Sequence, residues 1–346
     1  MSLFTPRKHA KDPCLQIQAD LSAMCDGELD AASIRRVMVH SDVCDSCKDF
    51  LHGIRTQAHA HREVAEAMSQ NPESSVKARE LRRQLTENRE QLAKILYELG
   101  RGFVFMGISP RFSRVVAREP VPVPDMAQRG RHFVDQLERQ SPTSANGAAN
   151  GAAASEWVRA RDLFASGYVN SPAENLEKGK RLLREVLALD PNFHAARIYL
   201  GHALHVEGQR VAARGEFEVV LRDASDVVMR AFALENVGNV WLEEGYPQRA
   251  MPYFVELVES GVIQKETRFF TTYFNLAIAC GLTLEFAACE SWLKRLYDEF
   301  PHKRPMILRE FRSRANFAAV LQEHPTVLNS FRTQFPCWFS VPMEAC

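Results

Sequence analysis

The sequence predicts an all-α protein in which a small, metal-stabilised helical domain precedes an array of helical repeats. Residues 37–50 place a histidine and two cysteines at helical spacing. Residues 74–100 carry leucine and isoleucine at helical intervals with a charged far side, which is typical of an amphipathic helix. In the C-terminal half, a pattern of small and large apolar residues recurs at regular intervals, as in repeat proteins.

Composition indicates an ordinary globular chain. The 346 residues are enough for two or three domains, and 46% of them are apolar and 25% charged. The 43 basic and 43 acidic residues balance, so we expect neither nucleic acid nor a membrane surface as partner. The apolar run at 103–108 is far too short to cross a bilayer, and residues 1–14 lack the apolar stretch of a secretory signal. We therefore expect a cytoplasmic protein.

His40, Cys44 and Cys47 form a candidate metal site. His40 and Cys44 are four residues apart and Cys44 and Cys47 three, so on a helix all three share one face. Cysteine and histidine are the ligands of tetrahedral Zn²⁺, which needs a fourth donor in a structural site. Two upstream cysteines, Cys14 and Cys25, compete for that role. In a chain without a leader such a cluster favours metal over disulfides, although buried packing alone is the alternative.

Residues 12 to about 55 resemble the zinc-binding domain of bacterial anti-sigma factors. They share its His-x3-Cys-x2-Cys core and the Asp-Gly-Glu-Leu turn at 26–29, and residues 75–100 match its fourth helix. The family's first ligand precedes the histidine by an interval that Cys14 matches (40 − 14 = 26) and Cys25 does not (40 − 25 = 15). The resemblance thus implies a Zn²⁺ site whose ligands are Cys14, His40, Cys44 and Cys47.

The resemblance also implies a partner, an RNA polymerase sigma factor of the extracytoplasmic-function class, gripped by apolar helix faces. Because metal-binding free energy is folding free energy in so small a domain, the grip would depend on zinc. The alternative for each apolar residue is a place in the domain's own core. The candidates for sigma contact are Leu21, Ile34, Val37, Leu51, Leu85, Leu92, Ile95 and Leu96.

A redox hypothesis follows from the same resemblance. A cysteine at the first ligand position is the arrangement of thiol-responsive members of the family. Oxidation of thiolate ligands would expel the metal and unfold the domain. On this hypothesis Cys14 pairs with Cys44 or Cys47, and Cys25 is a candidate resolving thiol.

Composition divides the chain at residues 141–155, which contain no charge and no large apolar side chain and are predicted to be a flexible linker. Before them we expect the zinc-binding domain at 1–100, with its last helix ended by Gly100, and a connecting segment of uncertain structure at 101–140, extended around its prolines. After them we expect repeats at 156–302, and capping helices and a tail at 303–346.

The repeat prediction depends on three segments, 199–221, 236–258 and 275–297, in which equivalent positions superpose. The step is 238 − 201 = 37 and then 277 − 238 = 39. The pattern resembles the tetratricopeptide repeat, in which small residues let two antiparallel helices approach closely. The aligned sets are Gly201, Gly238 and Ala277 in the first helix, Gly208, Gly245 and Leu284 at the turn, and then Ala213, Ala250 and Cys289, and Phe217, Phe254 and Leu293 in the second helix.

Arrays of this kind form a concave surface that binds a peptide or a partner helix, so a second protein or peptide is a possible partner. The alternative is that polar residues on that face only keep it soluble. The polar and aromatic residues of the first helices are Tyr199, His202, His205, Asn236, Asn239 and Asn275.

The leading interpretation is a cytoplasmic zinc-dependent anti-sigma factor with a tetratricopeptide domain for protein interaction or signal input. The alternative is an adaptor scaffold that combines a zinc finger with tetratricopeptide repeats and has no sigma-factor partner. The sequence contains no Gly-rich phosphate loop, no nucleophile elbow and no His-Glu-x2-His pattern. A zinc held by four protein ligands also has no open position for catalysis, so we do not expect an enzyme.

Overall fold

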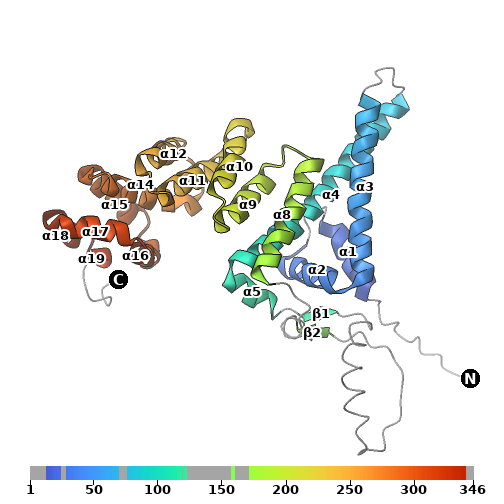
Figure 1. Ribbon diagram of the computed structural model, residues 1–346, viewed down its shortest axis with the longest axis horizontal. Coiled ribbons are helices and arrows are strands. Elements are labelled where there is room, and N and C mark those ends of the chain that lie inside the picture. Colours follow the sequence, from blue (N-terminus) through green and yellow to red (C-terminus); the bar gives the residue numbers. More distant parts are fainter. Residues whose placement is uncertain are drawn as a thin grey trace, which may run out of the picture. The chain divides into compact units, whose positions relative to one another are not determined.

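The computed structural model describes residues 13–24, 29–69, 76–118, 120–122, 157–159 and 171–339. The chain divides into two compact units, Met1–Ala203 and Leu204–Cys346 (Figure 1). Within the described residues the structure is helical apart from one pair of three-residue strands, which confirms the predicted all-α class. Among the described helices, none is both long enough and apolar enough to cross a membrane.

The first unit is built around two long helices, α3 and α4, which run side by side in Figure 1. The shorter helices α1 and α2 pack against them near one end. Asp30 caps α2, because its side chain accepts a hydrogen bond of 2.7 Å from the Ser33 N–H. The helices of this unit are α1 (Pro13–Ala23), α2 (Ala31–Val43), α3 (Asp45–Ser69), α4 (Val76–Ile108), α5 (Pro110–Val116) and α8 (Pro172–Leu189), and the division between the units falls inside α9 (His194–Val206).

The prediction that Gly100 ends the long helix is wrong, because α4 continues to Ile108. Gly100 is buried against α8, where a Cβ atom would lie 3.1 Å from the Leu183 side chain. A Cβ on Gly179 of α8 would lie 2.9 Å from the Gly100 carbonyl oxygen. The two glycines therefore let α4 and α8 approach closely. The absence of a side chain at Gly100 allows this packing and does not mark a helix end.

Ion pairs also fasten α8 to the helices before it. Arg55 of α3 donates from Nε to Glu185 Oε2 at 2.6 Å, and Lys178 forms an ion pair with Asp42 of α2. This helix falls within the predicted repeats at 156–302, whereas its contacts place it in the first unit. The predicted linker at 141–155 lies outside the described residues, as do Cys25 and residues 26–28 of the predicted turn.

The described part of the segment after α4 contains one short helix, α5, and one short strand, β1. Ser109 caps α5 by accepting a hydrogen bond of 3.2 Å from the Phe112 N–H. The chain is extended at β1 (Pro120–Pro122), as its prolines predict, and pairs antiparallel with β2 (Trp157–Arg159), Val121 opposite Val158.

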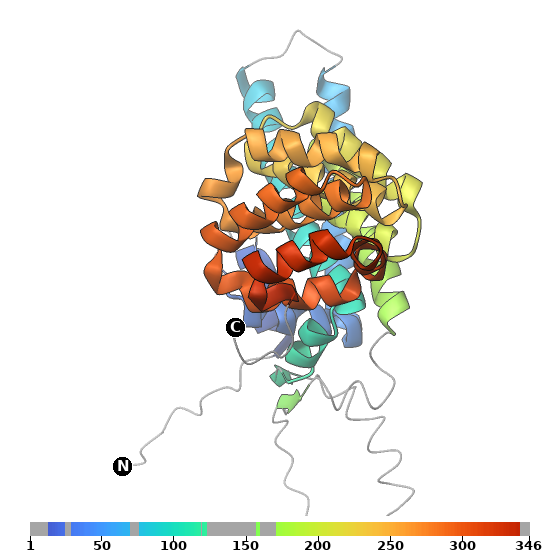
Figure 2. The same cartoon turned by 90° about the vertical axis from the view of Figure 1, so that its left-hand side faces the viewer.

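The second unit consists of helices that lie in successive layers from yellow to red in Figure 2. Helices α11 and α12 pack as one pair, and α14 and α15 as another, with α12 also packed on α14. The elements are α10 (Arg210–Asp223), α11 (Val227–Glu243), α12 (Pro247–Glu259), α13 (Val262–Lys265), the 3₁₀ turn Thr267–Phe270, α14 (Thr271–Leu282), α15 (Phe286–Glu299), the 3₁₀ turn Pro301–Lys303, α16 (Arg304–Ser313), α17 (Ala315–Glu323), α18 (Pro325–Gln334) and α19 (Pro336–Phe339).

The turn positions aligned from the sequence share one backbone conformation. Gly208, Gly245 and Leu284 all have positive φ, at 78°, 83° and 65°. In each case the N–H of the following residue bonds back to the preceding helix, as Tyr246 does to the Trp241 carbonyl at 2.9 Å and Glu285 to the Cys280 carbonyl at 2.8 Å. This is the left-handed closure of a helix C-terminus, so the structure shows recurring helical units. That they are tetratricopeptide repeats stays a prediction.

Most polar residues predicted on the first helices make bonds inside the second unit. Asn275 donates to Asn239 Oδ1 at 2.8 Å, and the buried Asn236 donates to the Phe232 carbonyl at 2.7 Å. His205 lies 3.0 Å from a carboxylate oxygen of Glu243. These contacts give the asparagines and His205 a role in stabilising the fold.

Candidate metal centre

Cys14, His40, Cys44 and Cys47 come together in the first unit. Their ligand atoms all lie within 4.8 Å of one another. Cys14 Sγ is 3.7 Å from Cys44 Sγ and 3.9 Å from His40 Nε2. The structure thus brings together the four residues predicted from the sequence, and it does so with Cys14 as the upstream member.

Three helices and one junction position the donors. Cys14 lies in the first turn of α1, His40 in the last turn of α2 and Cys47 in the first turn of α3. Cys44 is the residue between α2 and α3, with extended backbone at φ −102° and ψ 117°. Its N–H donates to the His40 carbonyl at 2.9 Å, and its carbonyl accepts from the Lys48 N–H at 2.9 Å.

The prediction that one continuous helix carries this motif is wrong. Cys44 closes α2 and opens α3, so the chain changes direction between His40 and Cys47. The donors meet because the two helices are joined by a single extended residue. The spacing that suggested one helix face is equally suited to this short junction.

Burial shields the donors from water. His40 and Cys47 have no exposed surface and Cys44 is 3% exposed, whereas Cys14 is half-buried. The helices that carry them also bury Ile17, Leu21 and Val37. Cys14 is thus the most exposed of the four donors.

Without a cation, three thiolates as close together as these would repel one another. Burial, followed by the neighbouring Cys44 and Cys14, raises the pKa of the Cys47 thiol. A cation reverses this situation, because a coordinating thiol is deprotonated outright. The clustering of three thiols and an imidazole around one point is therefore compatible with a bound metal ion.

The donor spacing fits four-coordinate binding. A tetrahedral ion with metal–sulfur bonds of about 2.3 Å separates its sulfur ligands by about 3.8 Å. The Cys14–Cys44 separation of 3.7 Å matches that value. Thiolate and imidazole ligands are those of zinc and other borderline or soft metals, so the residues are compatible with a bound metal ion.

The apolar residues proposed for sigma contact divide into two groups. Leu21, Val37 and Leu96 have no exposed surface and Ile95 is 2% exposed, so these four belong to the unit's own core. The partly exposed residues of the set are Ile34, Leu51, Leu85 and Leu92.

The described cysteines outside the cluster have other roles. Cys280 and Cys289 are buried at repeat positions, as packing predicts, and burial raises the pKa of Cys280 to about 11. Such a thiol is protonated and unreactive at neutral pH. Cys337 is disulfide-bonded, which the sequence analysis did not predict.

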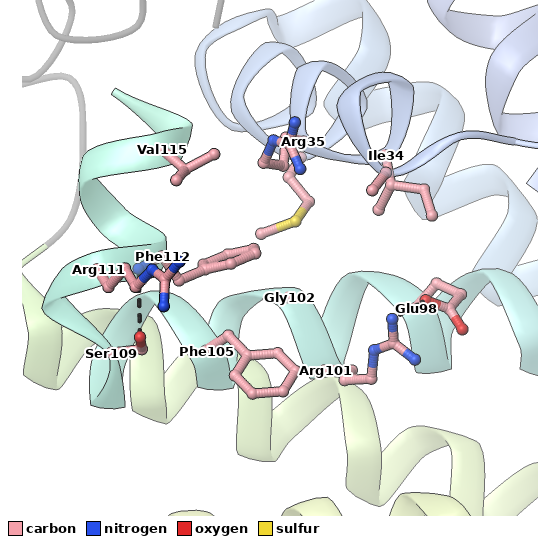
Figure 3. A pocket seen from close by; sticks show the side chains of 12 residues that line it. Ile34, Arg35, Glu98, Arg101, Gly102, Phe105, Ser109, Arg111, Phe112 and Val115 are labelled. Atoms are coloured by element: carbon pink, nitrogen blue, oxygen red, sulfur yellow. Dashed lines mark hydrogen bonds and ion pairs between the residues drawn. The ribbon is translucent and has the colours of Figure 1, made fainter. Parts of the chain in front are cut away.

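A cavity that the sequence did not predict lies between α2, α4 and α5, with Arg35, Arg101 and Arg111 in its lining (Figure 3). No short motif could have revealed it, because its residues come from three helices.

Comparison with family models gives no match to this chain, and comparison with curated proteins gives none either.

Proposed function

We propose that this protein is a zinc-dependent anti-sigma factor that acts in the cytoplasm and inhibits an RNA polymerase sigma factor of the extracytoplasmic-function class. The observation that carries the proposal is the convergence of Cys14, His40, Cys44 and Cys47 within 4.8 Å. Those residues form the motif on which the resemblance to anti-sigma domains depends.

Zinc is the metal that suits this donor set best. Three thiolates and one imidazole complete a tetrahedral structural site, and zinc supplies binding free energy without redox chemistry. In small zinc domains that free energy is about 10–16 kcal/mol at neutral pH. Helix α1 has 11 residues, too few for an isolated helix to be stable in water, so the metal would hold it against α2 and α3.

The sigma-factor part of the proposal uses the apolar side chains that the core leaves partly exposed. Ile34 lies on α2, Leu51 on α3, and Leu85 and Leu92 on α4. A partner helix could bury these side chains, and the zinc would act by keeping their helices in place. Loss of zinc would then release the partner.

The experiment compares metal content with sigma binding. The protein is co-purified with candidate extracytoplasmic-function sigma factors, and transcription by the reconstituted polymerase is measured. We expect about one zinc per chain, one sigma factor retained and its transcription inhibited. Cys47→Ala should abolish zinc binding and inhibition together. Cys289→Ala, a buried cysteine outside the cluster, is the matched control and should retain both.

One observation favours the alternative of an adaptor scaffold without a sigma partner. Helix α8 packs on α4 around Gly100, so part of the long helix is covered within the unit itself. A chain that binds stoichiometric zinc but inhibits no sigma factor would support the scaffold. A chain that binds no zinc would contradict both functions.

A further inference from the structure

A cavity of about 410 Å³ lies between α2, α4 and α5 in the first unit. Volumes of about 300–1,000 Å³ are typical of pockets for small organic ligands. The lining residues are Ala31, Ile34, Arg35, Met38, Glu98, Arg101, Gly102, Phe105, Ser109, Arg111, Phe112 and Val115. The cavity uses none of the four clustered metal donors.

Its walls are mainly apolar. Phe105 of α4 and Phe112 of α5 lie with their ring centroids 5.6 Å apart, and Val115 is 40% exposed beside them. Met38 fills the space over Gly102, because a Cβ atom on that glycine would lie 2.7 Å from the Met38 methyl carbon. Methionine adapts its shape readily, so this part of the wall can adjust to a ligand.

The lining contains more basic than acidic side chains. Arg35, Arg101 and Arg111 surround the apolar part in Figure 3, and Glu98 is the acidic residue among the lining residues. Glu98 Oε2 lies 3.3 Å from Arg101 Nη2, so one guanidinium already has a carboxylate beside it. Among the three arginines of the lining, Arg111 is the exposed one. A guanidinium binds a carboxylate with two parallel hydrogen bonds, which an ammonium group cannot do.

We propose that this cavity binds a small amphiphilic carboxylate, an acyl or aryl acid whose apolar body lies against Phe105, Phe112 and Val115 and whose carboxylate meets Arg111. Both parts of the ligand are needed, since the rings offer no polar partner and the arginines alone give weak, solvated ion pairs. The volume of about 410 Å³ suits a single small molecule and is too small for a folded partner. This inference does not depend on the identity of the metal or on a sigma factor.

The test measures binding of decanoate to full-length protein by isothermal titration calorimetry. Decanol has a similar apolar body without the charge, and acetate has the charge without the body. We expect saturable binding of one decanoate per chain, at least tenfold weaker binding of decanol, and no detectable binding of acetate. Equal affinities for decanoate and decanol would overturn the proposal, as would the absence of decanoate binding at millimolar concentration.

Matched variants locate the site. Arg111→Gln should weaken decanoate binding roughly tenfold and leave decanol binding unchanged, because it removes only the charged contact. Arg114→Gln changes an exposed arginine of the same helix outside the lining and should have no effect. Equal losses in both variants would show unspecific attraction and contradict the site. Val115→Glu, at an exposed lining position, should abolish decanoate binding while the helical circular dichroism stays unchanged; retained binding contradicts the proposal.

Discussion

The two units hold their helices together by different means. In the second unit the largest fully buried side chains are aromatic, among them Phe217, Phe254 and Tyr273. In the first unit they are aliphatic residues and one methionine, such as Leu21 and Met38. Aromatic side chains bury more surface each, so the second unit can depend on apolar burial alone. The first unit has four metal-donor side chains close together. Its stability should therefore depend strongly on these four residues and on the metal that they would bind.

The largest expected effect is removal of the metal. Treating the zinc-loaded chain with a strong chelator should expose the amides of α1, α2 and α3, because the proposed metal would link all three helices. Amides of α11–α15 should stay protected, since their unit contains none of the four donors. Hydrogen–deuterium exchange by mass spectrometry measures both regions in one sample. If the amides of α1, α2 and α3 were equally protected before and after chelation, the first unit would not depend on the metal, and the proposed difference between the two units would be wrong.

Phe254→Ala should have the opposite regional effect. The Phe254 side chain has no exposed surface and lies against Gly238, where a Cβ atom would be 2.5 Å from the ring. Truncation of such a residue costs about 3–5 kcal/mol of unfolding free energy. The second unit should unfold at lower denaturant concentration while zinc content is unchanged. Loss of zinc in this variant would show that the two units do not respond separately.

Gly179→Ala tests the close approach of α4 and α8. The added Cβ would lie 2.8 Å from the Val104 side chain and 2.9 Å from the Gly100 carbonyl oxygen, and the backbone cannot move aside cheaply. We expect destabilisation by about 1–3 kcal/mol. The control is Gly215→Ala on α10, where nothing lies within 4 Å and the change should stabilise the helix by up to about 1 kcal/mol. Chemical denaturation should show opposite signs for the two changes.

The smallest effect concerns the turn at Leu284. Its φ of 65° is strained for leucine, whereas Gly208 and Gly245 adopt the same region without cost. Leu284 is 55% exposed, so little burial is lost on its removal. Leu284→Gly should stabilise the second unit by about 1 kcal/mol, and Gly208→Leu should destabilise it by a similar amount. A lower melting temperature for Leu284→Gly would mean that the leucine side chain contributes more than the strain costs.

Local patterns predicted part of this molecule well. Helical spacing grouped His40, Cys44 and Cys47, and the resemblance to anti-sigma domains favoured Cys14 over Cys25; the structure brings these four residues together. The turn alignment placed Leu284 with Gly208 and Gly245, and all three have positive φ. Helix ends were harder to predict, because Gly100 is as good a terminator as a packing residue until its neighbour α8 is seen. The break at Cys44 was missed for a related reason, since both geometries satisfy the same spacing. The arginine-lined cavity depends on tertiary contacts, which no short pattern contains.

The packing of α8 in the first unit has a consequence for experiments that cleave or truncate the protein. Since Lys178 and Glu185 bind α2 and α3, a protease that nicks the chain between β1 and β2 should leave the two fragments associated. They should co-elute in size-exclusion chromatography until denaturant is added. Expression of residues 1–140 alone would instead leave the Gly100 face of α4 bare, so that truncation should aggregate.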